Sequence, residues 1–385
     1  MTKLKLLVKP THRCNFDCVY CYDKQFQVQE DMTLAMVEHI AKLAARTKKP
    51  ILWTWHGGEP LLMPIEFYTA ANEILLKYGI TDVAMQSNGS LLTEDWILRL
   101  KEWSWHYCIS FDGMANDLTR GHTEEVLNAV AMCKHFKYYP SIIRVVTPEN
   151  VTSLSRDYTF FKSLTTAFSM NRVFRTTAAA PLDDVAIAIY LEEYVRMLDE
   201  WINDPQPIVV RNFDEYLEFF LGTGNYICTY TGVCLGSFLS INPVGDMYPC
   251  DCWYPPEFCY GNICDYTTLE DIQTSNVFMR LQEIVAIRKE SCKDCLIYAF
   301  CNGGCNAAAV NISGGAHPEP LECKVRVKEF IHFFNTIKNL QIEVIPNPNL
   351  RKILCSAGYR SLPFLGEVLH EGYHAYCEAN TCLQS

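Results

Sequence analysis

The sequence lacks any long hydrophobic run, and its basic residues are in the minority. No apolar stretch approaches the roughly 20 residues that a membrane-spanning helix needs, which argues against a membrane protein. The first ten residues alternate charged and apolar side chains instead of forming the apolar core of a signal peptide, so we expect a soluble, cytoplasmic protein. The net charge of −11 argues against nucleic acid as a partner, because phosphate binding favours a basic surface.

Cysteine, by contrast, is abundant. The chain has 19 cysteines, and an odd number without an export signal argues against a disulfide framework. Reduced thiols at regular spacings are typical of metal ligands, and thiolates hold iron–sulfur clusters, usually four to a cubane. Eleven of the cysteines form three spaced sets: Cys14, Cys18 and Cys21; Cys228, Cys234 and Cys250; and Cys292, Cys295, Cys301, Cys305 and Cys323.

The first set, C-x3-C-x2-C, supplies only three thiolates. A cubane held by three thiolates leaves one iron open to a ligand that is not protein, and we expect the chemistry to occur there. The alternative is a non-catalytic electron carrier or zinc scaffold that uses the same thiolates and has no open iron.

Strand-like and helix-like segments alternate through the first half of the chain. Such alternation is typical of βαβ units with a parallel sheet, and six strands predict an open, partial (β/α)6 barrel of the α/β class. The expected strands are Leu4–Lys9, Ile51–His56, Asp82–Ser87, His106–Phe111, Ser141–Thr147 and Arg172–Thr176. The expected helices are about Thr33–Arg46, Ile65–Lys77, Glu94–Trp103, Glu124–Phe136, Ser153–Leu164 and Asp184–Ile202.

Polar or glycine-rich loops follow the first five expected strands. In α/β barrels the loops at the carboxyl ends of the strands build the active site, so these five loops should meet at one face. They are the Cys14–Cys21 run, Gly57-Gly58-Glu59-Pro60, Ser87-Asn88-Gly89, Ser110-Phe111-Asp112-Gly113 and Thr147-Pro148-Glu149-Asn150.

The alternation stops at about Arg211, and a region rich in cysteine, glycine and turns follows. A region so poor in long apolar elements needs additional cross-links, which metal clusters would supply. We expect helices at Leu269–Lys289 and near Val325–Lys338, and a weakly structured tail from Gln341. The predicted divisions are therefore a barrel over residues 1–210, a cysteine-rich domain over 211–340, and an extension of unknown role over 341–385.

Together these residues resemble the radical S-adenosylmethionine (SAM) superfamily, specifically its members with a C-terminal SPASM domain. The layout is most similar to that of anaerobic sulfatase-maturing enzymes and related maturases that modify ribosomal peptides. The resemblance covers about residues 3–338. It is specific, because the C-x3-C-x2-C run is followed in order by GGEP, SNG and SxDG loops and then by eight spaced cysteines.

The resemblance implies that Cys14, Cys18 and Cys21 hold a [4Fe–4S] cluster whose fourth iron binds the amino and carboxylate groups of SAM. Electron transfer then cleaves SAM to methionine and a 5′-deoxyadenosyl radical, which abstracts hydrogen from the substrate, while the protein positions the cofactor. The residues implied to contact SAM are Tyr20 beside the adenine, Gly57, Gly58 and Glu59 at the amino end of the methionine, and Ser87, Asn88, Ser110 and Asp112.

The resemblance further implies two auxiliary [4Fe–4S] clusters with four ligands each, suited to electron transfer. Cys228, Cys234, Cys250 and Cys305 would hold the first, and Cys292, Cys295, Cys301 and Cys323 the second. Asp251 matches the aspartate of the maturases' YPCD sequence, which acts as a general base. The alternative role for Asp251 is to accept backbone hydrogen bonds in a turn.

Some features depart from the maturase pattern. The third cysteine continues as Cys21-Tyr22-Asp23 where the maturases usually have CFY, and Cys252, Cys259 and Cys264 are additional. No wing domain precedes the first strand, so we expect no fused module that binds a leader peptide.

His56 could line the SAM pocket or be an ordinary core histidine. The sequence His370-Glu371-Gly372-Tyr373-His374 matches H-E-x-x-H, but Gly372 weakens the helix that a zinc site needs, so we interpret it as coincidental.

The sequence therefore predicts a radical SAM/SPASM oxidoreductase that modifies a residue of a peptide or protein substrate. Its product could be formylglycine, a thioether or a carbon–carbon crosslink. The alternatives are a sulfatase maturase proper and a dehydrogenase of a small metabolite. A flavodoxin- or ferredoxin-like protein is the expected reductant.

Overall fold

Seven strands between residues 4 and 210 lie side by side in chain order and run parallel. The computed structural model describes residues 3–25, 30–174, 179–220, 234–252, 256–315, 317–318, 320–341 and 344–356. The seven strands are β1 Leu4–Val8, β2 Ile51–Trp55, β3 Val83–Ser87, β4 His106–Ser110, β5 Ser141–Val146, β6 Ala167–Arg172 and β7 Val209–Val210.

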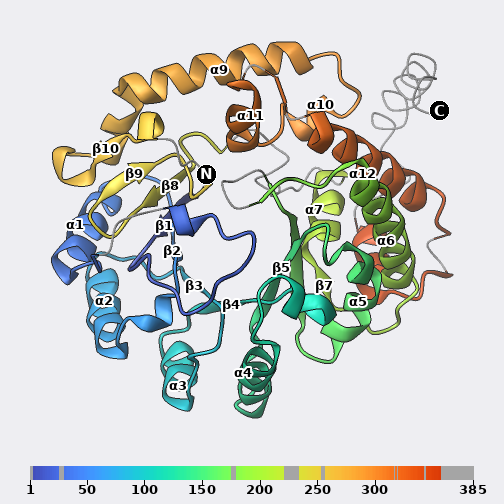
Figure 1. The fold of residues 1–385 in the computed structure, drawn as a ribbon, viewed down its shortest axis with the longest axis horizontal. Helices are drawn as coiled ribbons and strands as arrows, with labels where there is room; N and C mark the ends of the chain where they lie inside the picture. Colours follow the sequence, from blue (N-terminus) through green and yellow to red (C-terminus); the bar gives the residue numbers. More distant parts are fainter. Residues whose placement is uncertain are drawn as a thin grey trace.

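Three strands from the second half extend this sheet beyond β1. β8 (Phe238–Ile241) pairs in parallel with β1, and β9 (Asp246–Tyr248) and β10 (Gly261–Asn262) follow as antiparallel strands. The strand order among the described residues is β10-β9-β8-β1-β2-β3-β4-β5-β6-β7. The cysteine-rich region is thus joined to the barrel by backbone hydrogen bonds, and Figure 1 shows β8 and β9 beside β1.

Helices connect the parallel strands and lie outside the curved sheet (Figure 1). Several begin at a side-chain cap that accepts a backbone N–H, as Thr33 does for α1, Thr93 for α3 and Asp183 for α6. The helices up to residue 220 are α1 Leu34–Ala44, α2 Ile65–Lys77, α3 Glu94–Glu102, α4 Thr123–His135, α5 Leu154–Lys162, α6 Asp184–Ile202 and α7 Arg211–Phe220. Those of the second half are α9 Asn276–Cys292, α10 Tyr298–Cys301, α11 Asn306–Ser313, α12 Pro320–Lys338 and α13 Pro348–Ser356.

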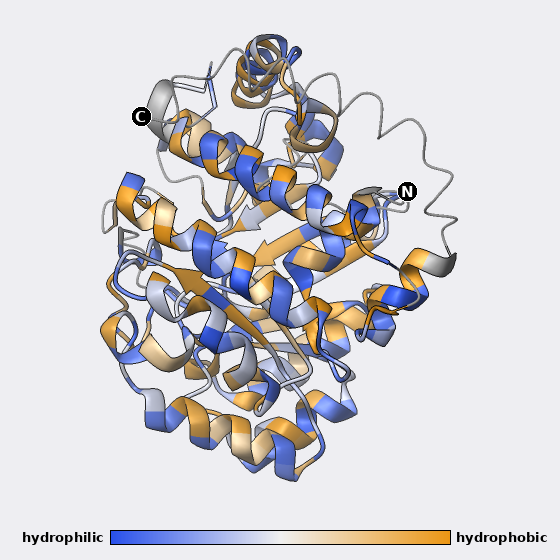
Figure 2. Ribbon diagram, turned by 90° about the vertical axis from the view of Figure 1, so that its right-hand side faces the viewer, coloured by the Kyte–Doolittle hydropathy of each residue, from blue (hydrophilic) through white to orange (hydrophobic). Residues whose placement is uncertain are grey.

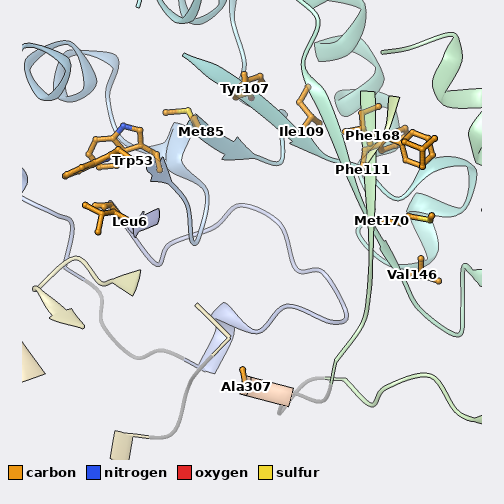
Figure 3. Packing of buried hydrophobic residues seen from close by; sticks show 14 of the residues in the cluster. Leu6, Trp53, Met85, Tyr107, Ile109, Phe111, Val146, Phe168, Met170 and Ala307 are labelled. Carbon is orange, nitrogen blue, oxygen red and sulfur yellow. The ribbon is translucent and has the colours of Figure 1, made fainter. Parts of the chain in front are cut away.

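The core fills the space between the sheet and these helices. Figure 2 shows hydrophobic and hydrophilic residues alternating around the helices, as expected when one side faces the core. Strand residues complete the core, and Leu6, Trp53, Met85 and Ile109 among them are buried (Figure 3). A continuous apolar layer therefore supports the strand ends that carry the predicted site.

The first five predicted strands and the six helices predicted for the barrel agree with the structure within two residues at each end. The prediction of the sixth strand was wrong, because this strand runs from Ala167 to Arg172 and not from Arg172 to Thr176. Phe168 and Met170 point into the core at alternate positions of this strand. Their burial determines where the strand lies more strongly than the β-forming residues that follow it in the sequence. The prediction of a weakly structured tail was also wrong at its start, because α13 buries Leu350 and Leu354.

Candidate functional site

Cys14 lies in the loop after β1, close to the loop after β3. Its Sγ accepts a hydrogen bond from the Phe16 N–H at 3.4 Å and lies 4.0 Å from Asn88 Nδ2. Burial raises the pKa of the Cys14 thiol to about 12, and the charges of Glu59, Cys18 and Cys21 add to this effect. The three thiols are thus close enough to repel one another as thiolates. A cationic metal cluster would relieve that repulsion, so this donor set fits an iron–sulfur cluster.

Glu59 joins the loops after β2 and β3. Its carboxylate is fully buried and accepts hydrogen bonds from Ser87 Oγ at 2.7 Å, the Asn88 N–H at 2.7 Å and the Leu61 N–H at 2.9 Å. Burial raises the pKa of Glu59, while these hydrogen bonds oppose the shift. Because both carboxylate oxygens have protein donors, Glu59 positions Ser87 and Asn88. Its predicted contact with SAM stays a prediction.

Gly58 brings the loop after β2 against the Cys14 loop. Its φ is +52°, and a Cβ atom there would lie 2.4 Å from the carbonyl oxygen of Arg13. The Gly58 N–H donates to Asp23 Oδ2 at 2.9 Å, and Lys9 Nζ and His12 Nδ1 contact the same carboxylate at 2.7 and 2.9 Å. Burial alone would raise the pKa of Asp23, but Lys9 and His12 hold it well below its usual range. Gly57, beside this network, also has a positive φ.

Tyr20 contacts the loop after β4. Its hydroxyl donates to Asp112 Oδ2 at 2.9 Å and accepts from Arg120 Nη1 at 2.9 Å. Asp112 is fully buried and also accepts from the Val145 N–H, which links β4 to β5. Sequence reasoning missed Arg120, whose charge acts on Cys18. A basic residue eight positions after the SxDG aspartate was the available signal.

Ser87, Asn88 and Ser110 lie at the carboxyl ends of β3 and β4, as predicted. All three are buried, and Ser110 Oγ accepts from Gln86 Nε2 at 3.3 Å. Their roles toward SAM remain predictions. The residues predicted to contact SAM nonetheless lie together at the carboxyl end of the sheet, on or beside the loops that follow β1, β2, β3 and β4.

Asp251 connects the barrel loops with the cysteine-rich region. Its Oδ2 accepts from Tyr22 Oη at 2.7 Å and lies 3.6 Å from His56 Nδ1. Tyr22 follows Cys21, and its hydroxyl is also 3.2 Å from His56 Nδ1. A small pocket beside this group is lined by Lys9, His12, Ser240, Asn242, Tyr248, Cys250 and Asp251.

The described cysteines of the first predicted auxiliary set lie together. Cys234 Sγ accepts from Asn306 Nδ2 at 3.2 Å, and Asn306 directly follows Cys305. Burial raises the pKa of Cys305 to about 12, with the charges of Cys252 and Cys234 contributing. Burial and the charges of Cys252 and Cys234 likewise raise the pKa of Cys250. Cys228 lies outside the described residues.

The second predicted set also converges. Burial raises the pKa of Cys323 to about 11, and the charges of Cys295, Cys301 and Cys292 add to it. Burial likewise raises the pKa of Cys301, but Arg326 opposes this with its charge and a hydrogen bond. Gly304, with φ +72°, leaves room for the Arg326 guanidinium, because a Cβ atom there would lie 2.0 Å from Nη1. Four soft donors around one position fit an iron–sulfur cluster.

The remaining sequence candidates either lie outside the described residues or have contacts of their own. The H-E-x-x-H sequence at 370–374, with Cys377 and Cys382, lies outside the described residues. Cys264 is exposed, and Cys259 Sγ contacts the backbone of Gly261. In the part of the chain that the structure describes, no helix is both long and apolar enough to span a bilayer.

Family models match two parts of the chain. The Radical SAM superfamily matches residues 8–155, and the SPASM iron–sulfur cluster-binding domain matches residues 233–296. A cysteine-type anaerobic sulfatase-maturating enzyme of Clostridium novyi is 26% identical over 332 residues, covering 79% of this chain and 88% of that protein. A serine-type enzyme of Bacteroides thetaiotaomicron is 26% identical over 346 residues, covering 78% and 82%.

Solved structures share the fold. Native anSMEcpe with bound AdoMet matches with a TM-score of 0.76 and 23% identity, covering 88% of this chain and 100% of that chain. Streptococcus suis SuiB bound to S-adenosylmethionine matches with a TM-score of 0.60 and 15% identity, covering 83% and 77%. The predicted partial barrel with a SPASM domain is confirmed, and the two domains imply SAM and [4Fe–4S] clusters as cofactors. This chain carries a radical SAM superfamily domain followed by a SPASM iron–sulfur cluster-binding domain.

Proposed function

We propose that this protein oxidatively modifies a residue of a peptide or protein substrate. The position of Asp251 carries the proposal, because it hydrogen-bonds to Tyr22 beside the three-cysteine loop and also follows Cys250 of the first auxiliary set. A base between the three-cysteine loop and the first auxiliary set can take a proton from a substrate that binds between these two regions. When bound, SAM and its cluster supply the 5′-deoxyadenosyl radical that starts the reaction.

The protein's own residues then have distinct tasks. Glu59 and Asp23 hold the loops that carry Asn88 and Cys14 in place. Asp251 would take the proton that the substrate loses after hydrogen abstraction. The auxiliary clusters that the SPASM cysteines would hold would supply the acceptor for the accompanying electron. The net change is the loss of two hydrogen atoms from the substrate, one with the adenosyl group and one as a proton and an electron.

Relatives support a peptide as the substrate class. Native anSMEcpe has been solved with bound AdoMet and Cp18Cys peptide, and SuiB with its precursor peptide SuiA. Cysteine-type and serine-type sulfatase-maturating enzymes are among the relatives in sequence, which favours sulfatase maturation as a second candidate function. We infer a flavodoxin- or ferredoxin-like reductant and a reducing compartment such as the cytoplasm, because both would maintain thiolate-held clusters.

The first test measures the chemistry that both candidates share. Anaerobically reconstituted protein should hold about 12 iron atoms per chain if all three clusters are cubanes. The reduced protein should cleave SAM to 5′-deoxyadenosine, and replacing Cys14, Cys18 and Cys21 together with Ala should abolish cleavage. Zinc in place of iron, or cleavage by the triple variant, would overturn the proposal.

The second test distinguishes general peptide oxidation from sulfatase maturation, and it also tests whether Asp251 is the base. Candidate peptides from neighbouring reading frames, and sulfatase peptides with Ser or Cys at the modified position, are incubated with protein and SAM. A product lighter by two hydrogen atoms supports peptide oxidation, whereas modification of the sulfatase peptides alone supports sulfatase maturation. Asp251→Asn should retain SAM cleavage and lose product. The control Asp265→Asn changes an exposed aspartate in the same region and should retain both.

A further inference from the structure

A buried network of charged side chains joins the barrel to the helix that carries the last predicted ligand of the second auxiliary set. Arg172 is the last residue of β6, at the carboxyl end of the sheet, and its side chain is 7% exposed. Its Nη2 donates to Glu322 Oε2 at 2.8 Å, and its Nη1 donates to Glu329 Oε1 at 2.8 Å. Both glutamates lie on α12, and Glu322 directly precedes Cys323. A barrel residue is therefore bound to α12 beside a predicted cluster ligand.

Glu322 also contacts a second buried arginine, Arg326. Arg326 Nη2 lies 3.5 Å from Glu322 Oε2, one helical turn further along α12, and its side chain is 3% exposed. Gly304 shows where this guanidinium lies, because a Cβ atom there would overlap Arg326 Nη1 and lie 3.6 Å from Cys301 Sγ. Arg326 is therefore next to a predicted ligand of the second set, with which it also forms a hydrogen bond.

The two arginines and two glutamates of this network carry equal and opposite charge. Tyr190 Oη donates to Glu329, so this carboxylate has a hydroxyl partner as well as Arg172. A buried network whose members are all hydrogen-bonded is held in one arrangement, and the loss of one charge leaves the others poorly compensated. Without Arg172, Glu322 would keep only its longer contact with Arg326 among the two ion pairs described for it.

We propose that Arg172 is a positioning residue of the second auxiliary cluster: it orients Glu322, which holds Arg326 beside the cluster, and this arrangement raises the reduction potential. The inference rests on the clusters that the SPASM domain implies and, for the source of the electron, on the proposed function. One added electron makes a cluster more negative by one charge, so a guanidinium at a ligand sulfur favours the reduced form. A strand of the barrel thereby sets how readily the SPASM domain accepts an electron.

The geometry requires an arginine at this position of β6. Arg172 Nε lies 3.3 Å from both carboxylate oxygens of Glu322, while Nη1 binds Glu329. The planar guanidinium can contact two carboxylates at once in a fixed direction, whereas the lysine ammonium is a single point charge on a flexible stem. Arg172→Lys therefore keeps the charge and loses part of the orientation, which separates the two effects.

The test measures the reduction potential of the second cluster in the full reconstituted chain. The signal of this cluster in electron paramagnetic resonance is identified as the one that Cys301→Ala loses. Arg326→Met should lower the potential most, Arg172→Met by a smaller amount, and Arg172→Lys by less than Arg172→Met. The control Lys328→Met removes an exposed positive charge from the same helix and should leave the potential unchanged, because solvent screens it.

Two results would overturn the proposal. One is an unchanged potential in Arg172→Met protein that holds the parent's iron content and has the parent's circular dichroism spectrum. The other is the full parent potential in Arg172→Lys, which would show that Arg172 acts by its charge alone; this variant decides the question even if Arg172→Met does not fold. SAM cleavage should persist in all the arginine variants. Failure of the proposed function would appear instead as a parent protein that forms no oxidised peptide.

Discussion

The two cysteine-bearing regions hold their thiols in different ways. In the barrel, buried carboxylates tie the loops together: Glu59 accepts from Ser87 and Asn88, and Asp23 accepts from Gly58. In the SPASM region, buried guanidinium groups lie among the thiols instead. Arg288 is fully buried and Arg326 nearly so. The barrel loops are thus held by carboxylates that have protein partners. In the SPASM region Arg326 lies 3.5 Å from the carboxylate of Glu322, whereas Arg288 has no ion-pair partner among the described residues.

Arg288 makes this contrast clear. Its guanidinium donates to the carbonyls of Gly303 and Gly315 and contacts the Asn306 side chain. Among the described residues, no carboxylate forms an ion pair with it. The negative charges that act on it are those of Cys305, Cys234 and Cys292, which come from both auxiliary sets. Since an isolated buried charge is unfavourable, the thiolates and their clusters should provide the counter-charge.

Removing iron should produce the largest difference between the two regions. A chelator under reducing conditions leaves the SPASM thiols without metal, and metal binding there is coupled to folding. We expect backbone amides of α10 and α11 to lose hydrogen-exchange protection, while β2–β5 remain protected. Mass spectrometry of peptides from both regions measures this. Equal loss of protection in β2–β5 would show that the barrel depends on its metal as well.

A buried ion pair in the barrel tests the claim that protein charges organise it. Arg144 on β5 and Asp157 on α5 are both fully buried, with Nε and Oδ2 2.9 Å apart. Asp157→Asn leaves the guanidinium without its counter-charge and should lower the free energy of unfolding by about 3–5 kcal/mol. Denaturant titration of the metal-free protein measures this. Glu102→Gln removes an exposed pair with Arg99 and should cost less than about 1 kcal/mol.

In the SPASM region, the matching change should alter electron affinity. Arg288→Met removes a positive charge beside both thiol sets, so the reduced clusters become less favourable and their reduction potentials should fall. A unit charge at short range in a protein interior predicts a shift of roughly tens of millivolts. Spectroscopic redox titration measures it, with Arg280→Met, an exposed arginine on the same helix, as control. Unchanged potentials in a fully loaded Arg288→Met protein would mean that the guanidinium is not part of the cluster environment.

The sequence was sufficient for the barrel and its loops because their signals are local. Five strands and the helices between them follow from hydrophobic periodicity, and the loops follow from position in the βαβ order. Periodicity failed at the sixth strand, where the core contacts of Phe168 and Met170 decide the boundary. The pairing of β8 with β1 also had no local signal, since it joins residues more than 230 positions apart.

Contacts within the site were less predictable than the residues themselves. The spacing of the cysteines identified the thiols. The contacts of Asp23 with Lys9 and His12 could not be predicted in this way, because they depend on how the loop after β1 folds back on itself. Arg288 is an ordinary helical residue in the sequence, and only packing shows that it is buried among cysteines. Cys252 was visible as an extra cysteine, but its proximity to Cys250 and Cys305 depends on the turn after β9.

The smallest expected effect concerns a barrel-side carboxylate that lacks a full set of partners. Glu215 on α7 is buried, and its Oε2 has no hydrogen-bond partner among the described residues, although Oε1 accepts from Arg211. Burial raises the pKa of Glu215 to about 7, so it binds a proton in the folded state at pH values where the unfolded chain has lost it. Its stabilising contribution is therefore complete below about pH 4 and is lost as pH rises through 7.

Glu215→Gln keeps the shape of the side chain and removes this titration. Relative to the parent protein, the variant should gain about 1–2 kcal/mol in the free energy of unfolding between pH 5 and pH 8. Denaturant titrations across this range measure the difference, and the exposed Glu192→Gln should show none. If the free energy of unfolding changes with pH in the same way for Glu215→Gln and for the parent protein, this carboxylate is solvated. In that case, Glu215 would be no exception to the paired carboxylates described in the barrel, and the contrast with Arg288 would become sharper.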